Sequence, residues 1–461
     1  MKKILLVLVV VIAIAIAAAA AWVMAGRAEG PAIDIVQPVS VVGAAGNLEV
    51  AVDTPSGRLS GLDVSLVQGD RELPLFSLAT PATAELQQET AERVRLTRGI
   101  GKGELPELAE GPARIVVRAA RPVLFGFRTA RSETVKEFTV DLEPPRVGVL
   151  STHHYVNHGG SEFVVYRVTP PEAESGVTVG EETYPGYPAS GVHLGGVSIT
   201  DPAIKVAFFA LLYDQDQETP ISVFAEDAAG NAVSVPMDHR AFARPFKRSR
   251  IELTDSFLAR VVPPIVELVP DLRAPDGELV ASYLNVNGEL RRRNTATIQS
   301  FVEKTVPETL WSGAFEQLAN TQVEASFADH RTYYYKDQEV DQQVHLGFDL
   351  ASTAHAPVHA GNAGTVLFAD TLGIYGNTVI VDHGMGVQSL YGHLSSFAVK
   401  PGDRVQKSQE LGRSGQTGLA GGDHLHFTML VGGRMVSPME WWDPHWIDDR
   451  ILRKLREAAG S

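Results

Sequence analysis

The sequence predicts a mainly β protein of several domains, with one apolar helix at its N-terminus and a helical connector before its last domain. Short segments of alternating or continuous apolar residues, separated by Gly, Pro and Asp, recur through most of the chain. Such segments are typical of antiparallel β-structure. An uncharged apolar run from Ile4 to Ala25 opens the chain. At 461 residues the chain is too long for one ordinary domain, and its length suggests about three.

Composition narrows the classes of function. Hydrophobic residues are 44% of the chain and charged residues 21%, which is ordinary for a globular protein. The net charge of -15 argues against nucleic acid, or any anionic surface, as the main partner. The chain has no cysteine, so disulfides and thiolate metal sites are excluded. A metal ion would have to be held by histidine and carboxylate side chains.

The N-terminal stretch, residues 1–29, is expected to be a transmembrane anchor or a signal sequence. A helix from Ile4 to Ala25 would span about 33 Å, enough to cross a bilayer. The two lysines before it would stay in the cytoplasm, which places the chain after Arg27 outside. Val23-Met-Ala25 is an acceptable cleavage site, but the run is longer than a usual signal core. That length favours an uncleaved, single-pass anchor in the cytoplasmic membrane.

Two β-sandwich domains are expected next, over 31–144 and 145–240. Segments such as Leu48-Glu-Val-Ala-Val alternate between apolar and polar residues, with turn residues between them. The boundary segment Thr139-Val-Asp-Leu-Glu-Pro-Pro and the turn Asp227-Ala-Ala-Gly-Asn resemble parts of bacterial immunoglobulin-like domains. The resemblance implies immunoglobulin-like N-terminal domains.

Residues 251–325 are predicted to form a helical connector. Thr254 precedes an apolar pattern and fits a capped helix start, and Pro263-Pro264 is expected to interrupt that helix. From 326 to 445 the sequence returns to strands separated by glycine turns. The last segment, 446–461, is predicted to be a short amphipathic helix or tail.

Three histidine motifs stand between Val344 and Pro438, namely His345-Leu-Gly-Phe-Asp349, Tyr391-Gly-His393-Leu394 and His424-Leu-His426. Histidine and aspartate are ligands that zinc takes, and a catalytic zinc keeps three protein ligands and one open position. His345 and Asp349 can converge on one ion across a strand end and a turn. The two histidines of H-x-H are expected to point to opposite faces of the strand. One is therefore expected to bind the metal and the other to act on the substrate.

In this order the motifs resemble those of the lysostaphin/LytM-type zinc metallopeptidases, which cut peptide bonds in bacterial peptidoglycan. Flanking segments match the family as well: Gly361-Asn-Ala-Gly-Thr-Val, Gly376-Asn, Asp382-His-Gly, Lys400-Pro-Gly-Asp and Gly412-Arg-Ser-Gly-Gln-Thr-Gly. The resemblance covers roughly the last quarter of the chain. It implies a small antiparallel β domain, 326–445, with zinc in a groove across the sheet.

The resemblance also implies the site residues. His345, Asp349 and His426 would bind Zn²⁺, and His393 and His424 would form the catalytic pair beside a zinc-activated water. The implied activity is an endopeptidase that hydrolyses the peptide cross-links of peptidoglycan. Some relatives have lost ligands and act only as activators, so the alternative is a non-catalytic regulator or wall-binding module.

The implied partners are the stem peptides or cross-bridges of peptidoglycan, the membrane through the N-terminal helix, and cell-wall or divisome proteins. Nucleic acid is not expected. His383 is predicted to make structural hydrogen bonds, and His355 and His359 are predicted to lie at the surface or rim. Residues 251–325 would either cover the groove and limit access to zinc or form a passive stalk.

Overall fold

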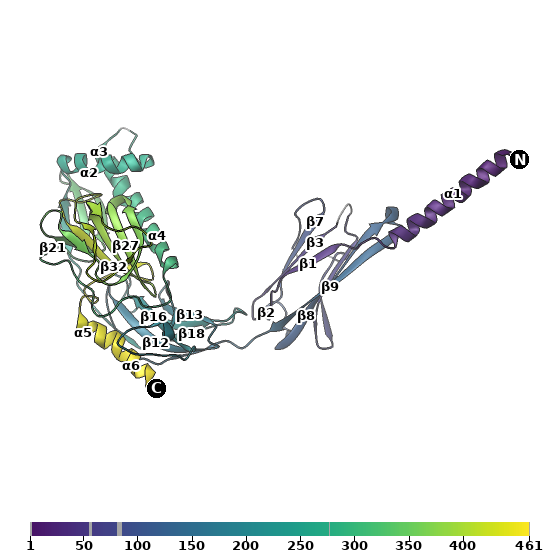
Figure 1. The fold of residues 1–461 in the computed structure, drawn as a ribbon, viewed down its shortest axis with the longest axis horizontal. Helices are drawn as coiled ribbons and strands as arrows, with labels where there is room; N and C mark the ends of the chain where they lie inside the picture. Colours follow the sequence, from purple (N-terminus) through teal and green to yellow (C-terminus); the bar gives the residue numbers. More distant parts are fainter. Residues whose placement is uncertain (1, 55–57, 81–84, 276, 461) are drawn as a thin grey trace. The chain divides into compact units, whose positions relative to one another are not determined.

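The computed structural model describes residues 2–54, 58–80, 85–275 and 277–460 (Figure 1). The chain divides into two compact units, Met1–Pro145 with Glu226–Ala232, and Arg146–Ala225 with Val233–Ser461. Each unit has its own hydrophobic core. The predicted mainly β class is confirmed, because strands outnumber helices in both units.

The first unit opens with α1 (Lys2–Ala25), a helix with no buried side chain. Among the residues that the structure describes, α1 is the one helix long and apolar enough to cross a membrane. Length and composition alone give this result, and a signal sequence meets the same criteria. Both predicted roles of the segment therefore stand.

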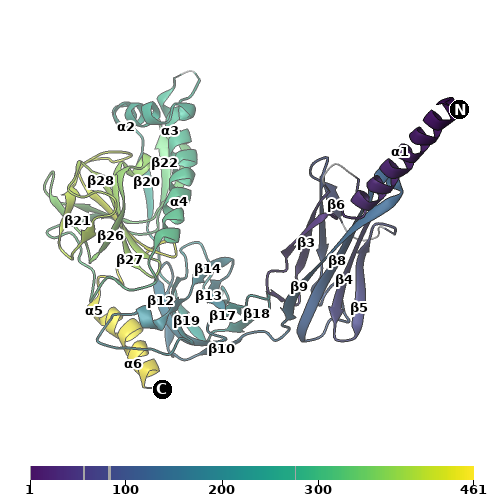
Figure 2. The same cartoon turned by 45° about the vertical axis from the view of Figure 1, so that its right-hand side comes forward.

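Two sheets build the rest of the first unit (Figure 2). One has the order β1 (Ala32–Gln37), β3 (Asn47–Asp53), β7 (Arg93–Gly99), β6 (Glu85–Gln88). The other has the order β2 (Val41–Val42), β9 (Arg128–Val140), β8 (Gly111–Val123), β4 (Gly61–Gln68), β5 (Arg71–Ser77). Alternate residues enter a shared core, with Leu48 and Val50 from one sheet and Leu62 and Ile115 from the other.

The second unit begins with two further four-stranded sheets. One has the order β10 (Arg146–Val149), β12 (Ser161–Thr169), β16 (Ile204–Ala210), β15 (Tyr187–Pro188). The other has the order β14 (Glu182–Pro185), β13 (Glu174–Val179), β17 (Ile221–Glu226), β18 (Ala232–Pro236). A parallel pair, β11 (His154–Asn157) and β19 (His239–Phe242), adjoins them. This arrangement is compatible with the predicted second sandwich.

Helices follow β20 (Arg248–Glu252). They are α2 (Asp255–Leu268), α3 (Leu279–Asn285) and α4 (Arg291–Ser300), with the short helical turns η3 (Pro270–Leu272), η4 (Val286–Leu290) and η5 (Phe301–Lys304). Thr254 caps α2 as predicted, since its Oγ1 accepts a hydrogen bond from the Phe257 amide at 3.2 Å.

The prediction that Pro263 and Pro264 interrupt the helix is wrong, because α2 continues to Leu268. A proline inside a helix removes a backbone donor and crowds the preceding turn. In α2 that cost is offset by an apolar face, which includes Val262 and Ile265 and is buried in the core of the second unit.

The last domain is built on an antiparallel sheet, as the family resemblance implied. Its order is β21 (Gln322–Ala325), β24 (Phe348–Ala351), β32 (Leu425–Val431), β28 (Val387–Leu394), β27 (Asn377–Gly384), β26 (Gly364–Thr371), β30 (Arg404–Val405), and β33 (Arg434–Val436) pairs with β32. Two smaller sheets complete it: β20 with β22 (Asp329–Tyr335) and β23 (Gln338–His345), and β25 (Pro357–His359) with β31 (Glu410–Arg413) and β29 (Ser396–Phe397). The turn η6 (Gly373–Tyr375) lies between β26 and β27.

The chain described here ends in helical turns: α5 (Pro444–Trp446), η7 (Ile447–Leu452) and α6 (Arg453–Ala459). Figure 2 shows them beside β12 of the second sandwich. Lys454 of α6 is fully buried and donates to Glu162 of β12 at 2.8 Å. One apolar cluster thus runs through the second sandwich, the helices and the last domain.

Candidate metal centre

Neighbouring strands bring His345, Asp349 and His426 together. His345 is the last residue of β23, Asp349 lies in β24 and His426 lies in β32. Asp349 and His426 are direct partners in the antiparallel β24–β32 pair, so their side chains leave the sheet on the same side. Two residues join β23 to β24, and this tight turn holds His345 over the same point. All three residues are buried.

The three candidate ligand atoms form a tight triangle. His345 Nε2 lies 2.9 Å from Asp349 Oδ1 and 3.0 Å from His426 Nδ1, and His426 Nδ1 lies 3.0 Å from Asp349 Oδ1. An imidazole nitrogen carries at most one hydrogen and an ionised carboxylate carries none, so at most two of these contacts can be hydrogen bonds. A zinc ion about 2.0–2.2 Å from each atom would use all three lone pairs. The donor set therefore fits a divalent metal ion.

The surroundings of the triangle leave its lone pairs available. His345 Nδ1 lies 3.3 Å from the Ser326 carbonyl, to which it can donate, and this leaves Nε2 free to face the centre. Burial lowers the pKa of His426 to about 4, which keeps that imidazole neutral at neutral pH. Burial would raise the pKa of Asp349, but electrostatic attraction and hydrogen bonding by the neighbouring histidines outweigh burial. The pKa of Asp349 is therefore well below its usual range.

Arg331 holds the second oxygen of Asp349. Its Nη2 donates to Asp349 Oδ2 at 3.1 Å, and its Nε lies 3.4 Å from Oδ2 of the buried Asp329. Arg331 stands on β22, whose neighbour β23 ends at His345. Sequence analysis did not find this residue, because the pairing of β22 with β23 is not visible in a motif. The contact fixes the rotation of the Asp349 carboxylate.

Gly347 is the second contact that sequence analysis missed. A Cβ at this position would lie 2.4 Å from His426 Cε1 and 2.5 Å from His426 Nε2. His426 Nε2 is buried without a hydrogen-bond partner among the described residues. The glycine therefore lets the imidazole lie flat against the β23–β24 turn and present Nδ1 to the centre. The H-L-G-F-D motif carried this signal at its middle position.

His393 and His424 lie beside the triangle. Their ring centroids are 4.8 Å apart, and the His393 ring is 5.8 Å from that of His426. His393 Nδ1 lies 2.7 Å from the Thr417 carbonyl, and His424 Nδ1 lies 2.9 Å from the Gly422 carbonyl. Each ring is thus held through Nδ1 and has Nε2 left for chemistry. Burial holds the pKa of His393 well below its usual range, so His393 is neutral at neutral pH.

The expectation that the H-x-H histidines point to opposite faces is wrong. His424 Nε2 lies 3.5 Å from Asp349 Oδ1, so both His424 and His426 reach the same carboxylate. The physical reason is that side chains two residues apart in a β-strand lie on the same face. The spacing of H-x-H therefore places His424 and His426 together, and β32, which begins at Leu425, continues that alternation.

Three further histidines of the last domain behave as predicted. His383 is fully buried, and its ring nitrogens lie 2.7 Å from the Ala363 carbonyl and 2.8 Å from Ser389 Oγ. His355 and His359 are exposed.

A groove of about 390 Å³ opens over the centre. Asp349, His424 and Arg331 line one part of it, and residues of the helical segment, Phe257 and Tyr283 among them, line another. Tyr333 is buried and also lines the groove. The groove gives the centre a place for an extended ligand.

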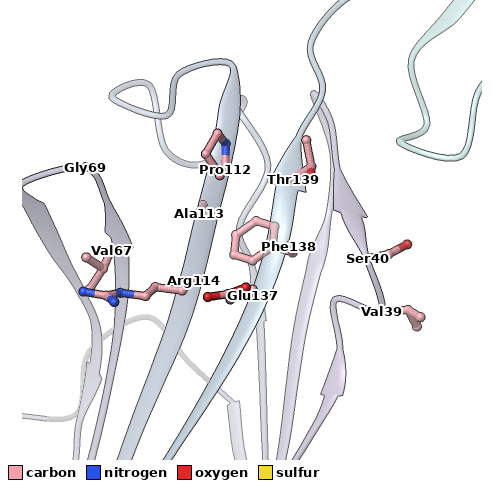
Figure 3. A pocket seen from close by; sticks show the side chains of 10 residues that line it. All are labelled: Val39, Ser40, Val67, Gly69, Pro112, Ala113, Arg114, Glu137, Phe138 and Thr139. Atoms are coloured by element: carbon pink, nitrogen blue, oxygen red, sulfur yellow. The ribbon is translucent and has the colours of Figure 1, made fainter.

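A hollow in the first unit has none of this chemistry. It has a volume of about 570 Å³ and lies over β8 and β9, lined by Phe138, Val67 and others (Figure 3). Arg114 and Glu137 stand opposite each other there in the β8–β9 register. No histidine lines the hollow. It offers no candidate for a histidine-bound metal.

Comparison with known proteins agrees with the geometry of the centre. The profile of peptidase family M23 matches residues 343–438. Peptidoglycan DD-endopeptidase ShyA of Vibrio cholerae serotype O1 is 28% identical over 166 residues, 36% of this chain and 35% of ShyA. Murein hydrolase activator EnvC of Escherichia coli K12 is 35% identical over 95 residues, 21% of this chain and 23% of EnvC. The chain thus spans about a third or less of these curated relatives.

A crystal structure of an M23 peptidase from Pseudomonas aeruginosa superposes with a TM-score of 0.38 at 18% identity, over 62% of this chain and 94% of that one. The family match covers all five candidate site residues, since they lie between His345 and His426. The C-terminal part of the chain is a peptidase family M23 domain, and the predicted lysostaphin/LytM-type resemblance is confirmed.

Proposed function

We propose that this chain is a zinc-dependent endopeptidase that hydrolyses peptide cross-links of bacterial peptidoglycan. The observation that carries the proposal is the triangle of His345, Asp349 and His426, with two further histidines beside it and a groove that reaches Asp349 and His424. The M23 match and the name of the relative ShyA support the substrate class. The N-terminal helix α1, as an uncleaved anchor, would keep the enzyme on the extracytoplasmic side, where peptidoglycan lies.

Two histidines and one carboxylate are a ligand set that zinc takes, and zinc would supply a Lewis acid that activates water. The protein's own residues supply the rest. Arg331 and Ser326 fix the orientation of the ligands. His393 and His424, each held through Nδ1, share two tasks through Nε2: one accepts a proton from the attacking water, and the other donates to the oxyanion that forms on the scissile carbonyl.

The groove supplies the position of the substrate. Its walls come from the loop before β32 on one side and from α2 and η4 on the other. An extended peptide laid along it would pass Asp349 and His424. Holding the scissile bond in this way lowers the entropic part of the barrier.

The test is digestion of purified sacculi by the full-length chain in detergent, with mass spectrometry of the released fragments. We expect new free amino and carboxyl ends at cross-links, and no cleavage of a panel of unfolded proteins. His345→Ala should abolish release. His359→Ala is the matched control, because it makes the same substitution at an exposed position of the same domain and should leave the rate unchanged.

One observation favours a second candidate, which is the match to the activator EnvC over 95 residues. A regulator would release nothing by itself but would speed digestion by a purified wall hydrolase, and His345→Ala would retain that effect. The two proposals therefore give opposite results in one assay.

A further inference from the structure

The β8–β9 hairpin of the first unit ends in an apolar tip that the fold leaves uncovered. The tip runs Val123-Leu-Phe-Gly-Phe127, and the two strands behind it are 13 residues each and paired up to Val123 and Arg128. Phe125 is 100% exposed and Phe127 is 76% exposed. Two large aromatic side chains therefore project into solvent at the end of a long paired ribbon.

The backbone of the tip is also unfavourable for its residues. Leu124 and Phe125 have φ of 52° and 55°, in the left-handed region that bulky side chains rarely adopt. Turns of this kind usually take Asn and Gly. Neither turn propensity nor solubility explains leucine and phenylalanine here. These residues violate a conformational preference, and among the described residues no contact compensates for it. Such residues indicate a function other than stabilising the fold.

The tip lies beside the C-terminal end of α1. Gly30 lies against the backbone of Arg131, and further along the same direction Arg128 Nη1 donates to the Trp22 carbonyl at 2.8 Å. The Arg128 guanidinium also covers the Trp22 ring, 4.7 Å from its centroid. The segment from Gly30 back to Trp22 therefore runs alongside β9 in the direction of the hairpin tip. The tip reaches the level of the last turn of α1.

We propose that this hairpin tip inserts into the lipid bilayer beside α1, at the boundary between headgroups and acyl chains. Tryptophan and other aromatic side chains favour that boundary, and Trp22 is half exposed at the end of the apolar helix. Arg128 and Arg121 flank the tip, and their charged ends match headgroup phosphates while their stems lie along apolar groups. Arg121 also donates to the Glu29 carbonyl at 2.9 Å, which ties the hairpin to the chain leaving α1.

The consequence is a two-point attachment. A single helix would leave the first sandwich free to swivel at the membrane surface, whereas a helix and an inserted hairpin fix its tilt. The proposal rests on α1 spanning the bilayer, so its test must report on α1 separately.

Because the chain has no cysteine, one introduced cysteine gives a unique label site. Full-length Phe127→Cys, with an environment-sensitive fluorophore, is reconstituted into nanodiscs that contain spin-labelled lipids. The label should lose emission roughly twofold or more, as expected for a group within the headgroup–acyl boundary. The control is Asp70→Cys, an exposed residue at the β4–β5 turn, which lies at the opposite end of the same sheet. It should not be quenched.

Adding Phe125→Asp to the Phe127→Cys chain should abolish the quenching, and Asp tolerates the left-handed backbone at that position. A label at Ile12 reports on α1. Quenching at Ile12 without quenching at residue 127 would overturn the hairpin proposal and leave the anchor in place. Absence of quenching at both positions would overturn both.

Discussion

At the scale of single residues, the centre distinguishes two kinds of histidine. His345 and His426 each have a ring nitrogen within 3.0 Å of Asp349 Oδ1, whereas His424 Nε2 is 3.5 Å away. His393 contacts the histidines of the centre through its ring. Loss of a ligand and loss of a proton-transfer group should therefore differ in what happens to the metal.

His345→Ala, Asp349→Ala and His426→Ala should each lose bound zinc and all hydrolysis, because two remaining ligands hold the ion poorly. His393→Ala and His424→Ala should keep zinc but lose at least about 100-fold in rate, the scale of a lost proton-transfer or oxyanion group. Elemental analysis and sacculus digestion measure the two properties, with His359→Ala as the matched control. Full zinc occupancy in a ligand variant, or metal loss with an intact fold in His424→Ala, would show that the assignment of the zinc ligands is wrong.

Arg331 gives a second prediction at this scale. Arg331→Gln removes the bond to Asp349 Oδ2, so the carboxylate is free to rotate away from the metal. We expect zinc affinity to fall about 10- to 100-fold, the usual effect of losing such a supporting contact. Competition with a chelator measures affinity without using activity. Arg404→Gln, at an exposed position of the same domain, should bind zinc like the parent chain. An unchanged affinity in Arg331→Gln would show that the carboxylate needs no such support.

Sequence motifs predicted the five histidine and aspartate residues that the structure brings together, because residues that are close in sequence within a motif remain close in the folded chain. The supporting residues were not predictable in the same way. Arg331 reaches Asp349 only through the register of β22 on β23, and no pattern within one segment encodes that register. His424 was predicted on the face opposite to His426, although side chains two residues apart in a strand share a face, so this part of the site could be predicted from the sequence.

At the scale of elements, α2 is a wall of the groove. Arg260 of α2 donates through Nη2 to the carbonyls of Gly421 at 2.8 Å and Ala420 at 3.3 Å, in the loop that precedes His424. A second hollow of about 340 Å³ lies between α2 and the Thr417 loop, on whose carbonyl His393 depends. The Arg260 contact thus bridges the catalytic loop and the helical segment.

The Arg260 contact allows a test of whether residues 251–325 cover the groove or form a passive stalk. If residues 251–325 cover the groove, Arg260→Gln should free α2 from the loop and raise the rate of sacculus digestion about tenfold, which corresponds to roughly 1.4 kcal/mol. Arg292→Gln, whose guanidinium bonds to Glu289 at 2.6 Å, is the control and should have no effect. An unchanged or reduced rate would mean that α2 does not obstruct the substrate and serves as a binding wall.

A truncation near Asn320 would test the same idea less cleanly. It would remove Trp311 and Phe315, which are buried in the core of the last domain and contact Trp441. Sequence reading placed these residues in the connector because hydrophobic spacing shows that a segment is buried but not which domain it packs against.

At the scale of the whole molecule, buried polar groups as well as an apolar core join the second sandwich to the last domain within the second unit. Glu440 follows the last strand of the M23 domain, yet its oxygens accept hydrogen bonds from Asn157 Nδ2 at 2.7 Å and from the Ser161 amide at 2.6 Å, both in the second sandwich. Glu440 is 5% exposed. The two residues of each contact are more than 270 positions apart in the sequence, so no local motif could have predicted these contacts.

Burial raises the pKa of Glu440 from 4.5 to about 7. Between these values the folded state binds more protons than the unfolded state, so the free energy of unfolding falls as pH rises through this window. Below about pH 4.5 the carboxyl is neutral in both states and the full contribution is present. Above pH 7 the protein must bury a carboxylate.

Glu440→Gln removes this titration while keeping an amide oxygen for one of the two donors. The free energy of unfolding of the variant, relative to the parent chain, should therefore rise by roughly 2–3 kcal/mol between pH 5 and pH 8. Denaturant unfolding at both pH values measures the difference, and titrations shared by the two chains, such as that of buried His154, cancel. Glu303→Gln, at an exposed position, should show a difference that does not depend on pH. A pH-independent difference for Glu440→Gln as well would mean that Glu440 stays ionised in the folded protein, held by its two donors.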